Sequence, residues 1–133
     1  MVTDLLGGQV KVGVDGISAA IGHIRDGKLR ALALTTASRI DELPGVPTVA
    51  ETLPGFEASG FSGIVAPKHT PKEIVDRLAD AVRAVQVDPK FKERLTSLGV
   101  SELSLSPAEF GKYIAEETEK WRKVVAFAGL KPQ

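Results

Sequence analysis

A strand, a short helix and a second strand follow one another near the N-terminus, and this order limits the fold more than any other feature. The run QVKVGV (residues 9–14) alternates valine with other residues, the periodicity of a strand with one apolar face. A helix is predicted over ISAAIGHIR (residues 17–25), with Gly27 as a left-handed stop. LRALALTT (residues 29–36) then has the composition of a buried strand. Two strands joined by a helix are expected to be parallel, with a right-handed connection.

The middle of the chain is irregular. Residues 37–55 hold three prolines, which fix φ and interrupt regular strand pairing. Within them, Thr48 and Glu51 have the spacing of a capping box that begins a short helix. Residues 56–67 (FEASGFSGIVAP) predict a third strand, whose glycines allow bends.

The C-terminal half predicts three helices. Thr70-Pro71-Lys72-Glu73 combines a capping box with proline at the first helical position. Asp88-Pro89 begins a second helix that Gly99 ends, and Ser106-Pro107-Ala108-Glu109 repeats the capping box before a third. That last helix should end near Gly129, with ion pairs Glu116–Lys120 and Glu119–Lys123 on its surface.

These elements predict an α/β fold with an incomplete parallel-type sheet and flanking helices. Three strands make a thin sheet for so many helices. Both faces of a parallel sheet need cover and its edge strands need partners. We therefore expect further strands that these residues do not supply.

Composition excludes several classes of protein. Lys+Arg and Asp+Glu number 17 each, so the formal net charge is zero and no basic nucleic-acid surface is indicated. The absence of cysteine excludes disulfides and cysteine-ligated metals. No apolar run approaches the roughly 18 residues of a membrane span, and no secretory signal pattern begins the chain.

No constellation for covalent or metal chemistry emerges. His23 and His69 have no second ligand at metal spacing, and no cofactor is expected. Trp121 and Tyr113 could form a stacking platform or pack in a core. Asp15 stands where α/β proteins bind ligands, between a strand and a helix. It could cap that helix by accepting from Ile17 or Ser18, contact a ligand, or do both.

The sequence resembles a known family through motifs along almost its whole length: GKLRALALTT, LPGVPTVAE, LPGFEASGFSGIVAPKHTPKEIVDRL and SPAEFGKYIAEETEKWRKVV. It is similar to the Bug family, also called TctC-like receptors, the substrate-binding receptors of tripartite tricarboxylate transporters. The resemblance implies a two-lobed periplasmic-binding-protein fold of type II. It also implies that this chain corresponds to the C-terminal portion of a longer receptor.

The resemblance implies a division of the chain. Residues 3–58 would be part of the second lobe, 59–67 a crossover strand, and 68–133 a helical part that packs on a first lobe mostly absent here. Asp15 and Gly16 match the family's ligand cleft. The implied partners are a small organic acid or related polar solute, the permease subunits of a membrane transporter, and the missing N-terminal lobe. The parent receptor would be periplasmic and not an enzyme.

Two alternatives stay open. One is an effector-binding domain of a transcription regulator, which can use a similar fold. The other is an inactive fragment that associates with a second copy through unpaired strand edges. On either receptor or fragment interpretation, the chain alone should bind solute weakly or not at all.

Overall fold

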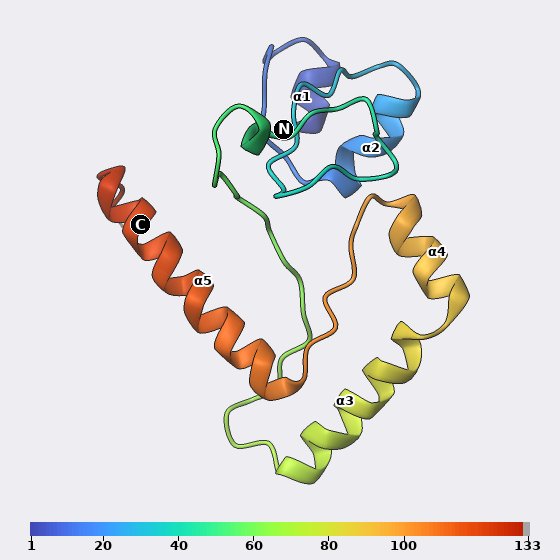
Figure 1. Cartoon of the computed structure of the whole chain (residues 1–133), viewed down its shortest axis with the longest axis vertical. Coiled ribbons are helices and arrows are strands. Elements are labelled where there is room, and N and C mark those ends of the chain that lie inside the picture. Colours follow the sequence, from blue (N-terminus) through green and yellow to red (C-terminus); the bar gives the residue numbers. More distant parts are fainter. Residues whose placement is uncertain (132–133) are drawn as a thin grey trace. The chain divides into compact units, whose positions relative to one another are not determined.

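The computed structural model describes residues 1–131, and its regular elements are helices (Figure 1). In chain order they are α1 (Val2–Leu6), α2 (Ile17–Arg25), the 3-10 helix η1 (Val49–Glu51), α3 (Lys72–Gln86), α4 (Pro89–Ser97) and α5 (Pro107–Phe127). Within residues 1–131 no regular strand forms, and strand-like pairing is limited to a parallel bridge between Leu34 and Thr48. All the predicted helices are present.

The three predicted strands, residues 9–14, 29–36 and 56–67, therefore do not form here, and the sheet of the α/β fold stays a prediction. A strand exists through backbone hydrogen bonds to a neighbour. Only a short part of residues 29–36 finds such bonds. Leu34 N–H donates to Pro47 O (2.8 Å), and Val49 N–H donates to Leu34 O (2.9 Å).

The same segment has a second neighbour. Ala58 N–H donates to Thr35 O at 2.9 Å. Successive residues of an extended chain direct their backbone groups to opposite sides. Residues 34–35 thus lie between two other segments, one on each side, which is the position of an inner strand.

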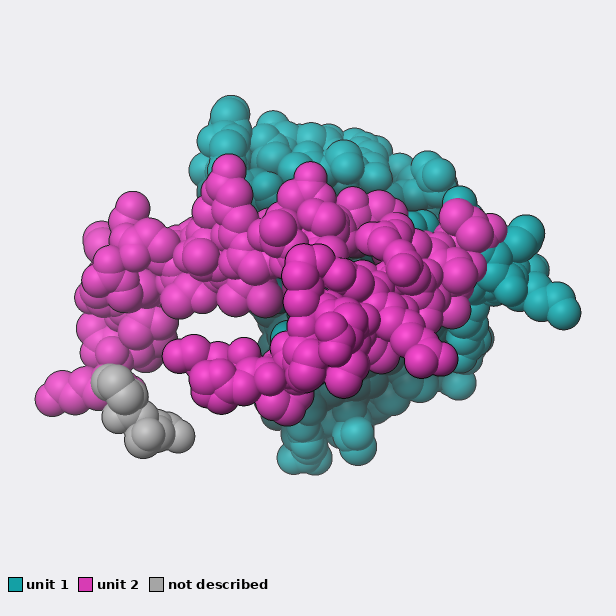
Figure 2. Space-filling view, turned by 90° about the horizontal axis from the view of Figure 1, so that it is seen from below, with its two compact units in different colours: residues 1–65, 88–102 teal, residues 66–87, 103–133 magenta. Residues whose placement is uncertain are grey.

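The chain divides into two compact units, shown in separate colours in Figure 2. Unit 1 comprises residues 1–65 and 88–102, and unit 2 comprises residues 66–87 and the chain from residue 103 onward. Unit 1 contains α1, α2, η1 and α4, and unit 2 contains α3 and α5.

Unit 1 has a small core. Its buried side chains are those of Ile21, Leu34, Leu43 and Thr48, and the most buried, Ile21, is 3% exposed. In unit 2, by contrast, no described residue is buried. Its amphipathic helix α3 leaves Ile74, Leu78 and Val85 about half exposed. Burial, and with it hydrophobic stabilisation, is therefore concentrated in unit 1.

Gly99 joins α4 to α2 inside unit 1. Its φ is +66°, and a Cβ at this position would lie 3.0–3.3 Å from side-chain carbons of Ile21, Ile17 and Ile40. Nearby, Arg25 Nη1 donates to Ser97 O at 3.1 Å. Only glycine satisfies both the left-handed backbone and this close approach.

The predicted helix starts are mostly confirmed. Asp88 accepts from Lys90 N–H at 2.8 Å, and Ser106 and Glu109 form the expected capping box. The hydrogen bond from the Ser106 hydroxyl lowers the pKa of Glu109. Thr48 and Glu51 also form a capping box, although the turn it begins is 3-10. Positive φ at Gly27, Gly99 and Gly129 confirms the predicted stops.

Two local predictions are wrong. The Thr70 capping box does not form, because Pro71 is itself the N-cap of α3 and its carbonyl accepts from Ile74 N–H at 3.0 Å. On α5, Lys120 pairs with Glu117 at 3.1 Å instead of Glu116. Helical spacing allows both i,i+3 and i,i+4 pairs, so the sequence alone could not choose between these partners. The Glu119–Lys123 pair is present at 3.8 Å.

We predict that Gly99→Ala destabilises unit 1 by about 1–3 kcal/mol, because the new methyl group meets both an unfavourable φ and three isoleucines. Gly22→Ala is the matched control. Gly22 lies inside α2, and a Cβ there meets nothing within 4 Å. This control should instead add about 0.5–1 kcal/mol through helix propensity. Urea denaturation measures both changes, and equal effects at the two glycines would contradict the packing described.

Candidate functional site

Asp15 and Gly16 lie immediately before α2, at an exposed point of unit 1. The Asp15 carboxylate accepts from Gly16 N–H at 2.8 Å. Gly16 is the N-cap, with φ −65° and ψ 132°, and no side chain of residues 1–131 caps the helix. The predicted cap by Asp15 is therefore wrong. Asp15 lies one residue too early, so its carboxylate reaches the N-cap amide and not those of Ile17 or Ser18.

The N-terminus of α2 carries partial positive charge. The first backbone hydrogen bond of the helix runs from Ala19 N–H to Gly16 O (3.1 Å), so the amides of Ile17 and Ser18 precede the helical ladder. Such amides favour an anion, whereas the neighbouring Asp15 carboxylate opposes one. The arrangement suits a polar solute. It also suits an acid that carries an ammonium group, or one that contacts the end of α2 through a water molecule.

Gly16 leaves room beside the helix end. A Cβ on Gly16 would have no atom within 4 Å, and its φ is one that any residue adopts. The fold of unit 1 therefore does not require glycine here.

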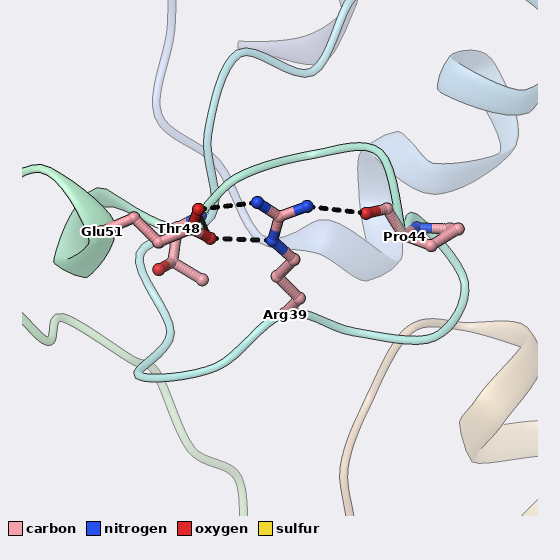
Figure 3. Close-up of polar contacts among 4 residues, drawn as sticks. All are labelled: Arg39, Pro44, Thr48 and Glu51. Carbon is pink, nitrogen blue, oxygen red and sulfur yellow. Dashed lines mark hydrogen bonds and ion pairs between the residues drawn. The ribbon is translucent and has the colours of Figure 1, made fainter.

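Arg39 is the centre of a side-chain hydrogen-bond network in unit 1 (Figure 3). Its Nε and Nη2 donate to the two carboxylate oxygens of Glu51, at 2.8 and 2.6 Å. Its Nη1 donates to Pro44 O at 3.0 Å, and Glu51 Oε1 also accepts from Thr48 N–H at 2.9 Å. We call these four residues the Arg39 clasp. The clasp links residues 39, 44, 48 and 51 of the proline-rich connector to one another. One of them, Thr48, also forms the parallel bridge to Leu34.

The clasp changes the acidity of Glu51. Hydrogen bonds from the Arg39 guanidinium, and then from Thr48 N–H, lower the pKa of Glu51 from 4.5 to about 2. The sequence prediction recognised Glu51 only as part of a capping box. Its pairing with an arginine twelve residues earlier had no local periodicity to signal it.

A hollow of about 390 Å³ opens between the connector and the α4 region of unit 1. Thr36, Ser38 and Arg39 line one side, and Lys92 and Ser101 line the other. Neither Asp15 nor Gly16 lines it. The structure therefore leaves the predicted ligand residues on open surface and not in an enclosed cavity.

The remaining candidates are the two histidines and Trp121. His23 lies on α2, and its buried Nδ1 has no hydrogen-bond partner within residues 1–131, while His69 is exposed in unit 2. Among residues 1–131, no three potential ligands gather to hold a metal. Trp121 is partly exposed and donates from Nε1 to Glu117 Oε2 at 3.0 Å. No helix of the described chain is long and apolar enough to cross a bilayer.

Comparison with known proteins decides the family. The sequence model described as "Tripartite tricarboxylate transporter family receptor" matches residues 1–130. The chain belongs to this family. The predicted resemblance is thus confirmed. The family consists of solute-binding receptors that serve transport, and not of enzymes.

Individual relatives agree. The chain is 34% identical over 131 residues to BugT of Bordetella pertussis, covering 98% of this chain and 40% of BugT. It is 37% identical over 132 residues to a UPF0065 protein of Agrobacterium vitis, covering 96% of this chain and 38% of that protein. It also matches the solved structure of the periplasmic binding protein BugD with a TM-score of 0.90 and 35% identity.

The BugD match covers 99% of this chain and 45% of BugD. The chain therefore spans less than half the length of these three relatives. It shares the fold of the matched part of a periplasmic binding protein. Nothing in the comparisons supports the alternative of a transcription regulator.

We predict that Arg39→Lys raises the pKa of Glu51 from about 2 toward its ordinary value of 4.5, because lysine cannot form the two-pronged contact. The folded-state pKa is depressed, so the clasp stabilises the fold above about pH 4.5, and this contribution is lost as pH falls toward 2. A carboxyl-detected NMR titration measures the midpoint. The exposed Arg30→Lys is the matched control and should leave it unchanged. An unaltered midpoint in Arg39→Lys would contradict the clasp.

Proposed function

We propose that this chain forms part of an extracytoplasmic solute-binding receptor for a tripartite tricarboxylate-type transporter. The receptor would bind a small organic acid, or a related polar solute, in the periplasm and deliver it to membrane permease subunits. The observation that supports this most strongly is the family match over residues 1–130. The close structural match to BugD is consistent with it.

The extended segments have a place in this proposal. In the complete receptor, residues 9–14, 29–36 and 56–67 would pair as strands of a parallel-type sheet. The bonds on both sides of residues 34–35 support an inner position for that segment. Residues 3–58 would belong to the second lobe, 59–67 to the crossover, and 68–133 to the part that packs on the first lobe. In this structure the compact unit that contains residues 1–65 also contains residues 88–102, which differs from that division of the chain.

The proposed ligand contact is at Asp15 and Gly16. The α2 N-terminus attracts a carboxylate, and Gly16 leaves space for its approach. The Asp15 carboxylate would select against a bare anion and in favour of a solute with a hydrogen-bond donor or ammonium group. Ligand binding would bias an open–closed equilibrium of the receptor. A site on open surface buries little of a ligand, so the chain alone should bind poorly.

We predict that this chain alone gives no measurable heat with small dicarboxylates up to about 1 mM, the weak end of specific binding. A chimera in which the chain replaces the matched 45% of BugD should bind at least one member of the panel. Isothermal titration measures both. Micromolar binding by the chain alone, or no binding by a folded chimera, would contradict the proposal.

The chimera also allows a test of the two residues. Gly16→Ala should keep the fold, because nothing lies near its Cβ, yet weaken solute binding by about tenfold through a clash with the ligand. Asp15→Asn should weaken amino-bearing dicarboxylates more than those without an amino group. Asp26→Asn, at the other end of α2 and paired with Lys28, is the control and should leave affinity unchanged. Wild-type affinity in both site variants would place the ligand elsewhere.

A further inference from the structure

The hollow between the connector and the α4 region belongs to unit 1 alone. Every residue that lines it lies within residues 36–42 or 92–102. Its volume, about 390 Å³, falls in the range of small-molecule sites. Apolar side chains line it together with polar ones, and they are those of Ile40, Leu95 and Val100. An apolar lining with a few charged groups is the usual composition of such a site.

Both sides of the hollow are held in place by contacts within unit 1. On the connector side, Thr36 Oγ1 donates to Ser38 O at 2.7 Å, and the Arg39 clasp fixes the Arg39 guanidinium (Figure 3). On the α4 side, Arg25 Nη1 donates to Ser97 O at 3.1 Å. A site whose sides are already ordered loses little conformational freedom when it binds a ligand.

Three charged side chains at the hollow have no partner within residues 1–131. Asp41 and Glu42 lie on the connector, and Lys92 lies on α4. Neither a hydrogen bond nor an ion pair engages these three side chains in the described part of the chain. The other charged groups at the hollow, Arg39 and Glu102, are already engaged. The hollow therefore offers two free carboxylates and one free ammonium group.

This set of charges distinguishes between classes of ligand. A metal ion is disfavoured, because no three potential metal ligands gather within residues 1–131. A dicarboxylate would meet two carboxylates of its own sign and a single ammonium group. A simple diamine would match the two carboxylates but would be repelled by Lys92. A ligand with two cationic groups and one anionic group matches all three side chains.

We propose that the hollow binds a small diamino monocarboxylic acid. The carboxylate of the ligand pairs with Lys92, and its two ammonium groups pair with Asp41 and Glu42. Neither Asp15 nor Gly16 lines the hollow. This site is thus separate from the proposed contact at the α2 N-terminus, and it does not depend on the proposed transport function.

An NMR titration of the whole chain with L-ornithine tests the proposal. The backbone amide shifts of residues 36–42 and 92–102 should change saturably at low salt, with a dissociation constant below about 1 mM. Binding should weaken as the salt concentration rises, because the site is open to solvent. Putrescine, a diamine without the carboxylate, should bind at least about threefold more weakly. Succinate should leave these amides unshifted.

Two variants assign the charges. Lys92→Gln should weaken ornithine binding about fivefold without weakening putrescine binding, since it removes an attraction for the carboxylate and a repulsion of the diamine. Glu42→Gln should weaken both ligands about fivefold. Lys90→Gln and Glu93→Gln are the matched controls. Both residues are exposed on α4 and lie outside the lining of the hollow, so neither change should alter affinity.

Three results would overturn the proposal. They are the absence of a saturable shift with ornithine, shifts confined to residues 15–18, and an equal loss of ornithine affinity in Lys92→Gln and Lys90→Gln. Because the readout is binding by this chain alone, the proposal can fail while the proposed receptor function stands, and the reverse.

Discussion

Backbone hydrogen bonding is the constraint on which this structure depends. An extended segment has donors and acceptors on both edges, and each must find a partner in protein or in water. Leu34 and Thr35 find protein partners on both sides, at Pro47, Val49 and Ala58. Leu34 and Thr48 are also among the few buried residues. Two of the four buried side chains of unit 1 thus lie where strand-like pairing exists.

The Arg39 clasp accompanies that pairing in a proline-rich connector that forms no continuous strand or helix. Prolines prevent residues 37–55 from forming a continuous strand or helix. The clasp instead fixes their path through side chains, by joining Arg39 to Glu51, to Pro44 O and, through Glu51, to Thr48 N–H. Thr48 is thereby held where it can bridge to Leu34. The helix α2 and its N-terminal residues Asp15 and Gly16 are carried by this same unit.

Features set by near neighbours were predictable from the sequence. The helices over residues 17–25, 89–97 and 107–127, the caps at Asp88 and Ser106 and the glycine stops depend on contacts within a few residues. The family was predictable because its motifs extend along the whole chain. Features that depend on distant partners were not. The Arg39–Glu51 pair, the approach of Gly99 to Ile21, and the failure of the predicted strands to form all lie beyond local pattern.

Residues 34 and 35 have backbone partners on both sides, whereas Val12 and Val14 have none within residues 1–131, and amide hydrogen exchange in the isolated chain tests this difference directly. Leu34, Val49 and Ala58 donate to backbone carbonyls, whereas within residues 1–131 no acceptor is found for the amides of Val12 and Val14, whose residues are 70% and 76% exposed. The account predicts measurable protection at the first three amides and exchange near the unfolded rate at Val12 and Val14. If the amides of Val12 and Val14 were protected as strongly as those of Leu34, Val49 and Ala58, residues 12–14 would already be paired, which would contradict this interpretation.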